Sequence, residues 1–335
     1  MALYSLGDMA SHFMLRHQNV RLNADMAQLA QEMASGQTAD IPRHLNGNYS
    51  YIGDVERKLR VLDGYDTAAK EASLFTSAMQ TALNKVQQTT TTLASDLILA
   101  GNTSLPEGMK VVSSTAKGEL GALLSALNTN VAGRSLFSGA ATDSIAFAST
   151  DAILTELKTL VTGETTLSGI LNAIDTWFDA PGGGFETNAY QGATTDLPSF
   201  LVGEGETIEL TLRGDNPAIR DLLKNTAIAA LTAEPDLGFP PSLQGALLVS
   251  AGKNLMSSEG AITSVRADLG YAESRLEESK TRGSAERASF EMSRNELLGV
   301  DPYETATRLE AVRFQLESLY TATSRLSQLS LVGYL

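Results

Sequence analysis

The sequence predicts a mainly α-helical, elongated protein that carries a small mixed α+β insert in its middle. Outside that middle, proline occurs only at Pro42, Pro106 and Pro302, so long helices can run there without interruption. On both sides of the middle, apolar or small residues recur at heptad spacing, which indicates coiled-coil helices. The segment 134–250 differs, because it holds six of the nine prolines and 15 acidic against 5 basic residues.

These observations divide the chain into five parts. We expect the two ends to pair, so that the helices outside the insert form an elongated antiparallel coiled-coil bundle. The predicted parts are an N-terminal axial helix and spoke over 1–45, long coiled-coil helices over 46–133, an acidic α+β outer domain over 134–250, a returning coiled-coil helix over 251–300, and a C-terminal axial helix over 301–335.

Each end of the chain carries a narrow apolar strip at helical spacing. Neither strip can bury enough surface alone to offset a backbone ordering cost of roughly 1–2 kcal/mol per residue, so each helix needs a partner. The candidate interface residues at the N-terminal end are Leu15, Leu22, Met26, Leu29 and Met33. Those at the C-terminal end are Leu309, Val312, Leu316, Leu319, Leu326, Leu329, Leu331 and Leu335.

The strongest heptad pattern lies between Val55 and Leu97. One register contains Val55, Leu62, Ala69, Thr76, Leu83, Thr90 and Leu97, and the other contains Lys58, Tyr65, Ala72, Met79, Val86 and Leu93. A helix of this length would span on the order of 65 Å at 1.5 Å per residue. Because Ala and Thr alternate with larger side chains, we expect close approach to more than one neighbouring helix.

The remaining elements follow in order along the chain. Pro106, with Ser104 ahead of it, marks the start of a helix over 107–132. The insert should hold helices over 153–161, 167–178 and 218–231, and a hairpin of 197–202 with 207–212 that turns at Gly203-Glu204-Gly205. A coiled-coil helix then returns over 243–298, with Leu255, Ile262, Leu269 and Leu276 at heptad spacing.

Composition excludes several classes of protein. The 335 residues include no cysteine, so the chain has no disulfide framework, thiolate nucleophile or cysteine-ligated metal. A net charge of −14 argues against binding to nucleic acid or to an anionic membrane. The first 30 residues contain no apolar run of the kind found in a signal peptide, and we expect neither cleavage nor membrane insertion.

A search for catalytic motifs finds none that is specific. His12, His17 and His44 are not spaced as metal ligands. Gly252-Lys253 has Asn254 where a phosphate-binding loop needs Ser or Thr, and the acidic turn at Gly203-Glu204-Gly205 would repel a pyrophosphate. We therefore predict no catalytic, cofactor-binding or metal-binding residue, no cofactor and no enzymatic activity.

Motifs at both ends resemble the bacterial flagellar axial proteins of the flagellin and hook–filament junction type. The segment Gln28–Gln37 is similar to the family's "L..L…..SG" stretch, where a helix stops at Gly36, and Gly133–Gly139 is similar to its "YLFSG" turn. Arg266–Glu277 resembles "R..LG….RLE", and Ala311–Tyr320 and Arg325–Leu335 resemble the terminal helix. The ending LSLVGYL is closer to the junction type, hook-associated protein 3, than to the filament subunit.

This resemblance implies a structural subunit that joins the hook-associated ring to the flagellin filament. The implied partners are other copies in a ring, the preceding hook-associated protein, flagellin and a flagellar export chaperone. The implied location is the extracellular flagellum, reached by export without a cleaved signal peptide. The terminal strips would then be largely disordered in the free subunit and would fold inside a tube.

Other interpretations stay open at the level of sequence. A divergent flagellin would share the same motifs. An intracellular coiled-coil adaptor with an unrelated insert would have ordered termini in the isolated chain. An enzyme would require a site in the insert that these motifs do not reveal.

Overall fold

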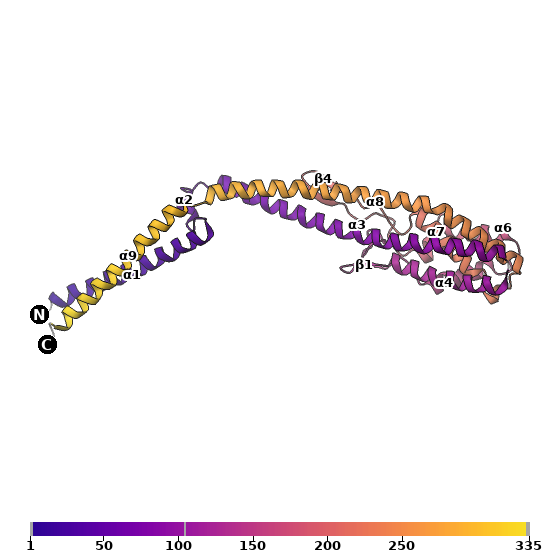
Figure 1. Ribbon diagram of the computed structural model, residues 1–335, viewed down its shortest axis with the longest axis horizontal. Helices are drawn as coiled ribbons and strands as arrows, with labels where there is room; N and C mark the ends of the chain where they lie inside the picture. The colour runs from indigo at the N-terminus through magenta and orange to yellow at the C-terminus, as the bar shows by residue number, and fades with distance from the viewer. Residues whose placement is uncertain (1–2, 104, 333–335) are drawn as a thin grey trace. The chain divides into compact units, whose positions relative to one another are not determined.

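The computed structural model describes the backbone of residues 3–103 and 105–332, and the side chains of 9–103 and 105–325. It is mainly helical, with two short antiparallel hairpins in the middle of the chain (Figure 1). The first and last long helices pack together, and the predicted fold class is confirmed. Within the described ranges, none of the helices combines the length and apolarity needed to cross a bilayer.

The elements follow in chain order. The first half contains α1 (Leu3–Ser35), α2 (Ile41–His44), α3 (Ser50–Thr103), α4 (Pro106–Leu127), β1 (Asn130–Val131), β2 (Arg134–Ser135) and α5 (Thr150–Val161). The second half contains α6 (Leu167–Asp179), η1 (Phe185–Ala189), β3 (Phe200–Gly203), β4 (Glu206–Ile208), α7 (Pro217–Leu231), η2 (Pro235–Leu237), α8 (Pro241–Leu298) and α9 (Pro302–Val332).

The chain divides into two compact units. Unit 1 holds the residues up to Asp63 and those from Ser284 onward, and unit 2 holds Gly64–Gly283. Helices α3 and α8 each contribute one part to unit 1 and another to unit 2. Unit 2 contains most of the buried core, whereas unit 1 is built mainly from paired helices.

The heptad seam of α3 is buried as its spacing predicts. Every residue of the first register is at most 8% exposed, and in the second register Ala72, Met79, Val86 and Leu93 are buried too. The other two members of that register are not buried: Tyr65 is half-buried, and Lys58 is exposed while the adjacent Leu59 is buried instead. The predicted residues of α8 (Leu255, Ile262, Leu269 and Leu276) are also buried.

Two glycines let α3 and α8 approach closely within unit 2. A Cβ at Gly101 would lie 2.6 Å from the Gly245 carbonyl oxygen, and a Cβ at Gly252 would lie 2.8 Å from the Ala94 carbonyl oxygen. Any residue larger than glycine at either position would therefore clash with the backbone of the other helix. The close approach of these two helices is therefore made at glycines, neither of which belongs to the predicted Ala and Thr positions of the seam.

Polar contacts fix the register of the same two helices. The Gln80 side chain donates to the Arg266 carbonyl oxygen at 2.9 Å. In return, Arg266 donates to the side-chain oxygens of Gln80 at 3.2 Å and Gln87 at 2.6 Å. A slip of one turn would leave these partly buried groups without partners, which costs more than the contacts contribute.

Helix α4 begins at Pro106, which occupies the first turn as predicted, and ends at Leu127 rather than Ala132. Leu105 stands at the N-cap and supplies no side-chain hydrogen bond, while Ser104, the predicted start signal, lies outside the described residues. The helix ends early because Ala132 and Gly133 take positive φ angles of 51° and 79° and close the β1–β2 hairpin.

The second hairpin is shorter than its alternating pattern predicts. Strands β3 and β4 pair from Phe200 with Ile208 to Gly203 with Glu206, and the turn contains the predicted Gly205 at φ 71°. The pattern of alternate burial continues to Leu212, with Leu210 buried and Thr211 exposed, but no strand pairs there within the described part of the chain. Alternating apolar and polar residues show that one face of a segment is buried, but they do not provide a neighbouring strand for it to pair with.

An aromatic cluster anchors the rest of unit 2. The rings of Phe147, Phe178, Phe185 and Tyr190 contact one another at centroid distances between 5.6 and 6.4 Å. The Tyr190 hydroxyl donates to the Phe137 carbonyl oxygen at 3.1 Å, and burial raises the pKa of that hydroxyl. Helix α7 covers the cluster, with Arg220 stacked over Phe185.

Candidate assembly surface

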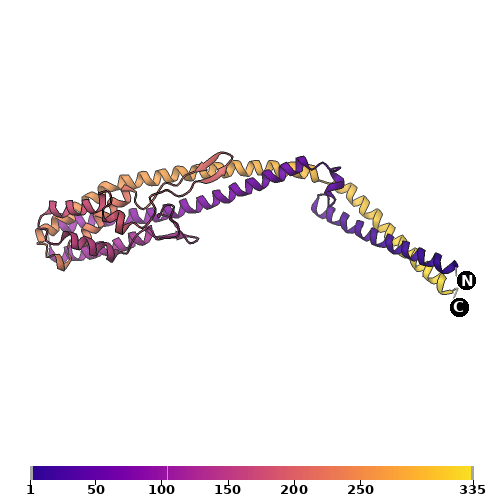
Figure 2. The ribbon, with the colours of Figure 1, turned by 180° about the vertical axis from the view of Figure 1, so that it is seen from behind.

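The first and last helices pair with each other in unit 1. Helices α1 and α9 lie side by side and run in opposite directions, so the start of α1 lies next to the end of α9 (Figures 1 and 2). The two helices of this pair, Leu3–Ser35 and Pro302–Val332, come from opposite ends of the sequence. This arrangement matches the prediction that each weak terminal helix needs the other.

The facing sides of the pair repeat at heptad spacing. Leu15, Leu22, Met26 and Leu29 of α1 are half-buried, as are Leu309, Val312 and Leu319 of α9. Leu316 is the one member of this predicted set that is fully buried, at 5% exposure. Because most of these side chains keep part of their surface in water, each gains less than the roughly 1.5–3 kcal/mol of complete burial.

Other predicted interface residues lie elsewhere. Met33 is 50% exposed, and the neighbouring Glu32 is buried at 7% exposure. The side chains of Leu326, Leu329 and Leu331 lie outside the described residues, as does the whole of Leu335. The structure thus brings together the part of the predicted set between Leu15 and Leu29 with the part between Leu309 and Leu319.

Glu32 organises the chain segment that follows α1. Helix α1 ends at Ser35, and Gly36 takes a φ of 70°, as the helix-stop prediction requires. One Glu32 carboxylate oxygen accepts hydrogen bonds from the Gln28 side chain and the Ala39 backbone N–H, both at 3.0 Å. The buried carboxylate therefore holds residues 36–39 against the helix that precedes them.

The same segment is tied to the end of α8. The Thr38 N–H donates to the Leu298 carbonyl oxygen at 2.8 Å, and the Val300 N–H donates to the Gly36 carbonyl oxygen at 3.1 Å. The side chains of Gln37 and Asn295 add a contact of 2.9 Å. This short antiparallel bridge fixes where α1 enters the pair and where α9 leaves α8.

A polar contact links α1 and α9 farther along the pair. The side chains of Asn19 and Asn23 hydrogen-bond the Tyr320 hydroxyl and lower its pKa. Asn23 also donates to the Asn19 carbonyl oxygen at 2.8 Å, which orients the amide. Tyr320 is exposed, so the contact aligns the two helices more than it stabilises them.

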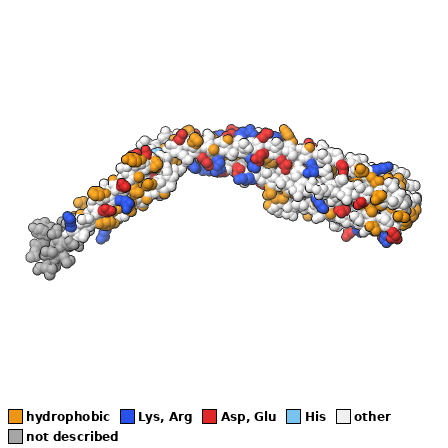
Figure 3. Space-filling view, viewed as in Figure 1, with side chains coloured by type: hydrophobic (Ala, Val, Ile, Leu, Met, Phe, Trp, Pro, Cys, Tyr) orange, Lys and Arg blue, Asp and Glu red, His pale blue; other side chains and the backbone are white. Residues whose placement is uncertain are grey.

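A second apolar stripe lies on the outward side of the pair. Met9, Phe13 and Val20 of α1 are 67%, 71% and 64% exposed. At 3.6 residues per turn, Phe13 and Val20 point about half a turn away from Leu15 and Leu22, so they do not face α9. Figure 3 shows hydrophobic side chains over this part of the molecule. The predicted interface set does not include this stripe, although the apolar spacing of 4 and 7 residues was a signal for it.

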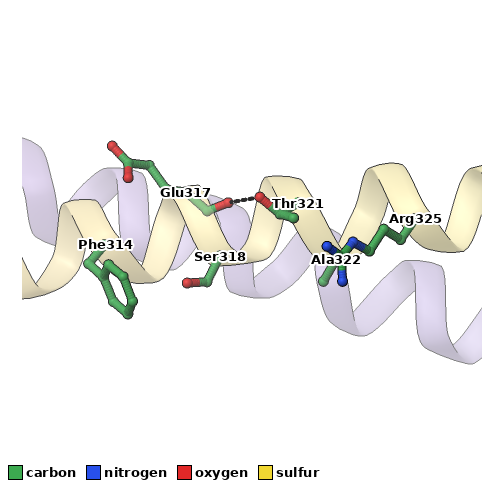
Figure 4. A pocket seen from close by; sticks show the side chains of 6 residues that line it. All are labelled: Phe314, Glu317, Ser318, Thr321, Ala322 and Arg325. Atoms are coloured by element: carbon green, nitrogen blue, oxygen red, sulfur yellow. Dashed lines mark hydrogen bonds between the residues drawn. The ribbon is translucent and has the colours of Figure 1, made fainter.

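Helix α9 carries an outward hollow of its own. Phe314, which is 70% exposed, lies on one side of a shallow depression of about 480 Å³ on the helix surface (Figure 4). The other lining residues are Glu317, Ser318, Thr321, Ala322 and Arg325. A wide, shallow hollow with small residues at its floor accommodates side chains of a neighbouring helix better than an enclosed small molecule.

The three histidines, which are the residue type most often found as metal ligands, are solvated. His12, His17 and His44 are all exposed. Over the described ranges, no group of three or more His, Asp or Glu side chains is arranged to hold a metal ion. The sequence predicted no metal site, and this finding adds no candidate.

Two apolar stripes on one terminal helix pair, one half-buried and one exposed, are features of a helical structural subunit built for self-association. Comparison with known proteins identifies the kind of assembly. The family model for the bacterial flagellin N-terminal helical region matches residues 9–142, and the model for the flagellin C-terminal helical region matches residues 256–335.

A solved structure gives the same picture. The chain is similar in fold, with a TM-score of 0.51 and 14% sequence identity, to a protein from Vibrio parahaemolyticus assigned as flagellar hook-associated. The match covers 72% of this chain and 94% of that one. Among curated proteins, no sequence matches this chain.

The chain belongs to the flagellin-like family. It is a structural subunit of the bacterial flagellum, and the family is structural rather than enzymatic. The predicted family resemblance is confirmed at this level, and so is the extracellular flagellar location that the family implies.

Proposed function

We propose that this chain is the hook–filament junction subunit, which binds the hook-associated ring on one side and flagellin on the other. An assembly role is supported by the α1–α9 pair, on which large apolar side chains are exposed to solvent. These are Met9, Phe13, Val20 and Phe314. Such an exposed stripe on a helix pair is typical of a surface that is covered in a polymer.

The energetics of the pair fit addition to the end of a growing structure. Most apolar side chains between α1 and α9 are only half-buried, so their burial offsets only part of the entropy cost of ordering two long helices. The terminal helices are therefore weakly structured in the free subunit. Neighbouring copies cover the outward stripe and supply the missing apolar surface. Association and helix formation are then coupled, which prevents the subunits from aggregating before they reach the assembly site.

Two features favour the junction role over the filament role. The C-terminal ending LSLVGYL resembles the junction type more than the filament type. The similar solved structure is described as hook-associated, and this chain spans nearly all of it. Export without signal cleavage, guided by a flagellar chaperone, is part of the same proposal.

Deletion of the gene for this chain tests the junction role. Cells without the protein should keep the hook but shed unassembled flagellin into the medium, and expression of the intact chain should restore filaments. Filaments that assemble normally in the deletion strain would reject the proposal.

The second candidate is a divergent filament subunit, which both flagellin family matches favour. The two roles differ in copy number, because a junction subunit forms one short zone and a filament subunit repeats along the whole length. Quantitative mass spectrometry of sheared flagella should find this chain far below the main flagellin. A comparable abundance would favour the filament role.

A further inference from the structure

A groove in unit 2 is lined only by residues of that unit. It runs between β4 with the residues that follow it and one face of α8, and its volume is about 600 Å³. Glu206, Glu209 and Thr211 line it from the strand side, and Asp268, Tyr271 and Arg275 line it from α8. The three α8 residues are spaced by 3 and 4 positions, so they form one helical face.

The strand side of this groove offers an unpaired backbone edge. Strand β4 pairs with β3, and no residue of β3 lines the groove, so the groove follows the other edge of β4. The chain continues beyond Ile208 with Glu209 and Thr211 exposed and Leu210 buried. Outside helices and strands, no backbone hydrogen bond joins Glu209, Leu210 or Thr211 to another residue of the described ranges. An edge of this kind is a template for one more strand.

The groove also has a defined charge. Glu209 and Asp268 are exposed, and neither forms an ion pair within the part of the chain that the structure describes. The cation in the groove is already engaged, because Arg275 lies 3.7 Å from Glu206 and donates to the Thr207 carbonyl oxygen at 3.5 Å. Two carboxylates therefore face an incoming ligand, beside the Tyr271 ring, which is 69% exposed.

We propose that this groove binds an extended basic segment of a partner protein. The segment adds to the free edge after β4 through backbone hydrogen bonds, and its Lys or Arg side chains reach Glu209 and Asp268. A second copy of this chain is a poor occupant, because the chain has a net charge of −14 and the electrostatic complementarity would be lost. The proposal is independent of the junction role, since it concerns unit 2 and a different partner.

Peptide binding to the full-length monomer tests this groove. The probe is a fluorescent peptide of alternating lysine and valine, compared with a glutamate–valine peptide and with a lysine–valine peptide N-methylated on alternate backbone amides. We expect only the unmodified basic peptide to bind well. The double variant Glu209→Gln/Asp268→Asn should bind it about tenfold more weakly, as expected when attractive charges are removed from an interface.

A matched variant separates the groove from general attraction to an acidic protein. Asp143→Asn/Glu164→Gln removes the same charge from exposed positions elsewhere in unit 2 and should bind the peptide like the wild type. Circular dichroism of both variants verifies that they are folded. Equal binding by the two variants, equal binding of the N-methylated peptide, or no binding to the wild type would each overturn the proposal.

Discussion

Glu32 shows how one buried carboxylate can position a chain segment. Its two hydrogen bonds, to the Gln28 side chain and the Ala39 N–H, join α1 to the segment that bridges to α8. The sequence favoured Met33 at this place because an apolar residue continues the heptad strip. Burial of Glu32 depends instead on a partner seven positions away across a turn, which periodicity does not reveal.

The substitution Glu32→Ala should loosen this segment. The Ala39 N–H loses its acceptor and becomes hydrated, because Ala39 is exposed, so the cost is that of one hydrogen bond, about 0.5–1.5 kcal/mol. Hydrogen exchange at the Ala39 amide of the assembled polymer should accelerate accordingly. Glu310→Ala, at an exposed position of α9, serves as the control and should leave the rate unchanged. Unchanged protection of Ala39 in Glu32→Ala would show that the carboxylate is not its essential partner.

Lys224 plays a comparable role in unit 2. Its ammonium group lies 2.6 Å from Asp179, 3.1 Å from Asp175 and 3.3 Å from Asp221. Burial alone would lower the pKa of Lys224, but the hydrogen bonds to Asp179 and Asp175 and the charges of those carboxylates outweigh it, so the pKa is raised. The stabilisation is therefore complete at neutral pH and is lost only as the pH rises through the folded-state pKa.

Lys224→Met should destabilise unit 2 by about 1 kcal/mol at neutral pH, because three half-exposed carboxylates then repel one another. The difference from the wild type should be smaller at about pH 11.5 than at pH 7, because the stability linked to the Lys224 ammonium begins to fall once the pH exceeds the ordinary lysine pKa. Urea denaturation at both pH values measures it. A difference that is independent of pH would indicate that the variant acts through packing alone.

At the scale of elements, the long helices were predictable and the short strands were not. Helix α8 was expected over 243–298 and is found over Pro241–Leu298, because a sustained heptad pattern and the absence of proline leave no competing structure. Strand β4 ends at Ile208, although TIELTL alternates to Leu212, because a strand needs a neighbour that sequence patterns do not locate. The domain boundaries drawn from charge and proline remain predictions.

Close packing of α3 on α8 can be tested with two glycines of the same helix. A Cβ at Gly252 would lie 2.8 Å from both the Ala94 carbonyl oxygen and Ile98 Cγ1, whereas Gly260 has nothing within 4 Å. Gly252→Ala should therefore cost about 1–3 kcal/mol, and Gly260→Ala should stabilise the helix by up to about 1 kcal/mol. Thermal unfolding of the two variants should shift in opposite directions. A shift in the same direction would contradict the close-approach interpretation.

The outward stripe is the element on which polymer formation depends in this account. Phe13→Ser or Phe314→Ser should raise the critical concentration for assembly roughly tenfold or more, since each ring contributes about 1.5–3 kcal/mol when it is buried. Unit 2 should melt as in the wild type, because both rings lie in unit 1. Gln18→Ser, at an exposed polar position of α1, is the control. Sedimentation of the polymer measures the effect, and unchanged assembly would exclude these rings from the contact.

For the whole molecule, the two units differ in how they are stabilised. Unit 2 has a continuous core that includes Phe75, Met79, Phe147 and Leu248. In the α1–α9 pair, by contrast, only Leu316 of the described predicted seam is fully buried. Ordering of each residue costs roughly 1–2 kcal/mol of backbone entropy, so we expect the pair to depend on surface that other subunits provide. We propose that the terminal helices are completed by neighbouring subunits.

Hydrogen exchange of the full-length protein, measured residue by residue on the monomer and on the polymer, tests this claim most directly. We expect the amides of 9–33 and 303–325 to exchange rapidly in the monomer, while the part of α3 in unit 2 is protected. The same terminal amides should become protected after assembly. Strong protection of both terminal helices in the monomer, with no further gain in the polymer, would contradict it.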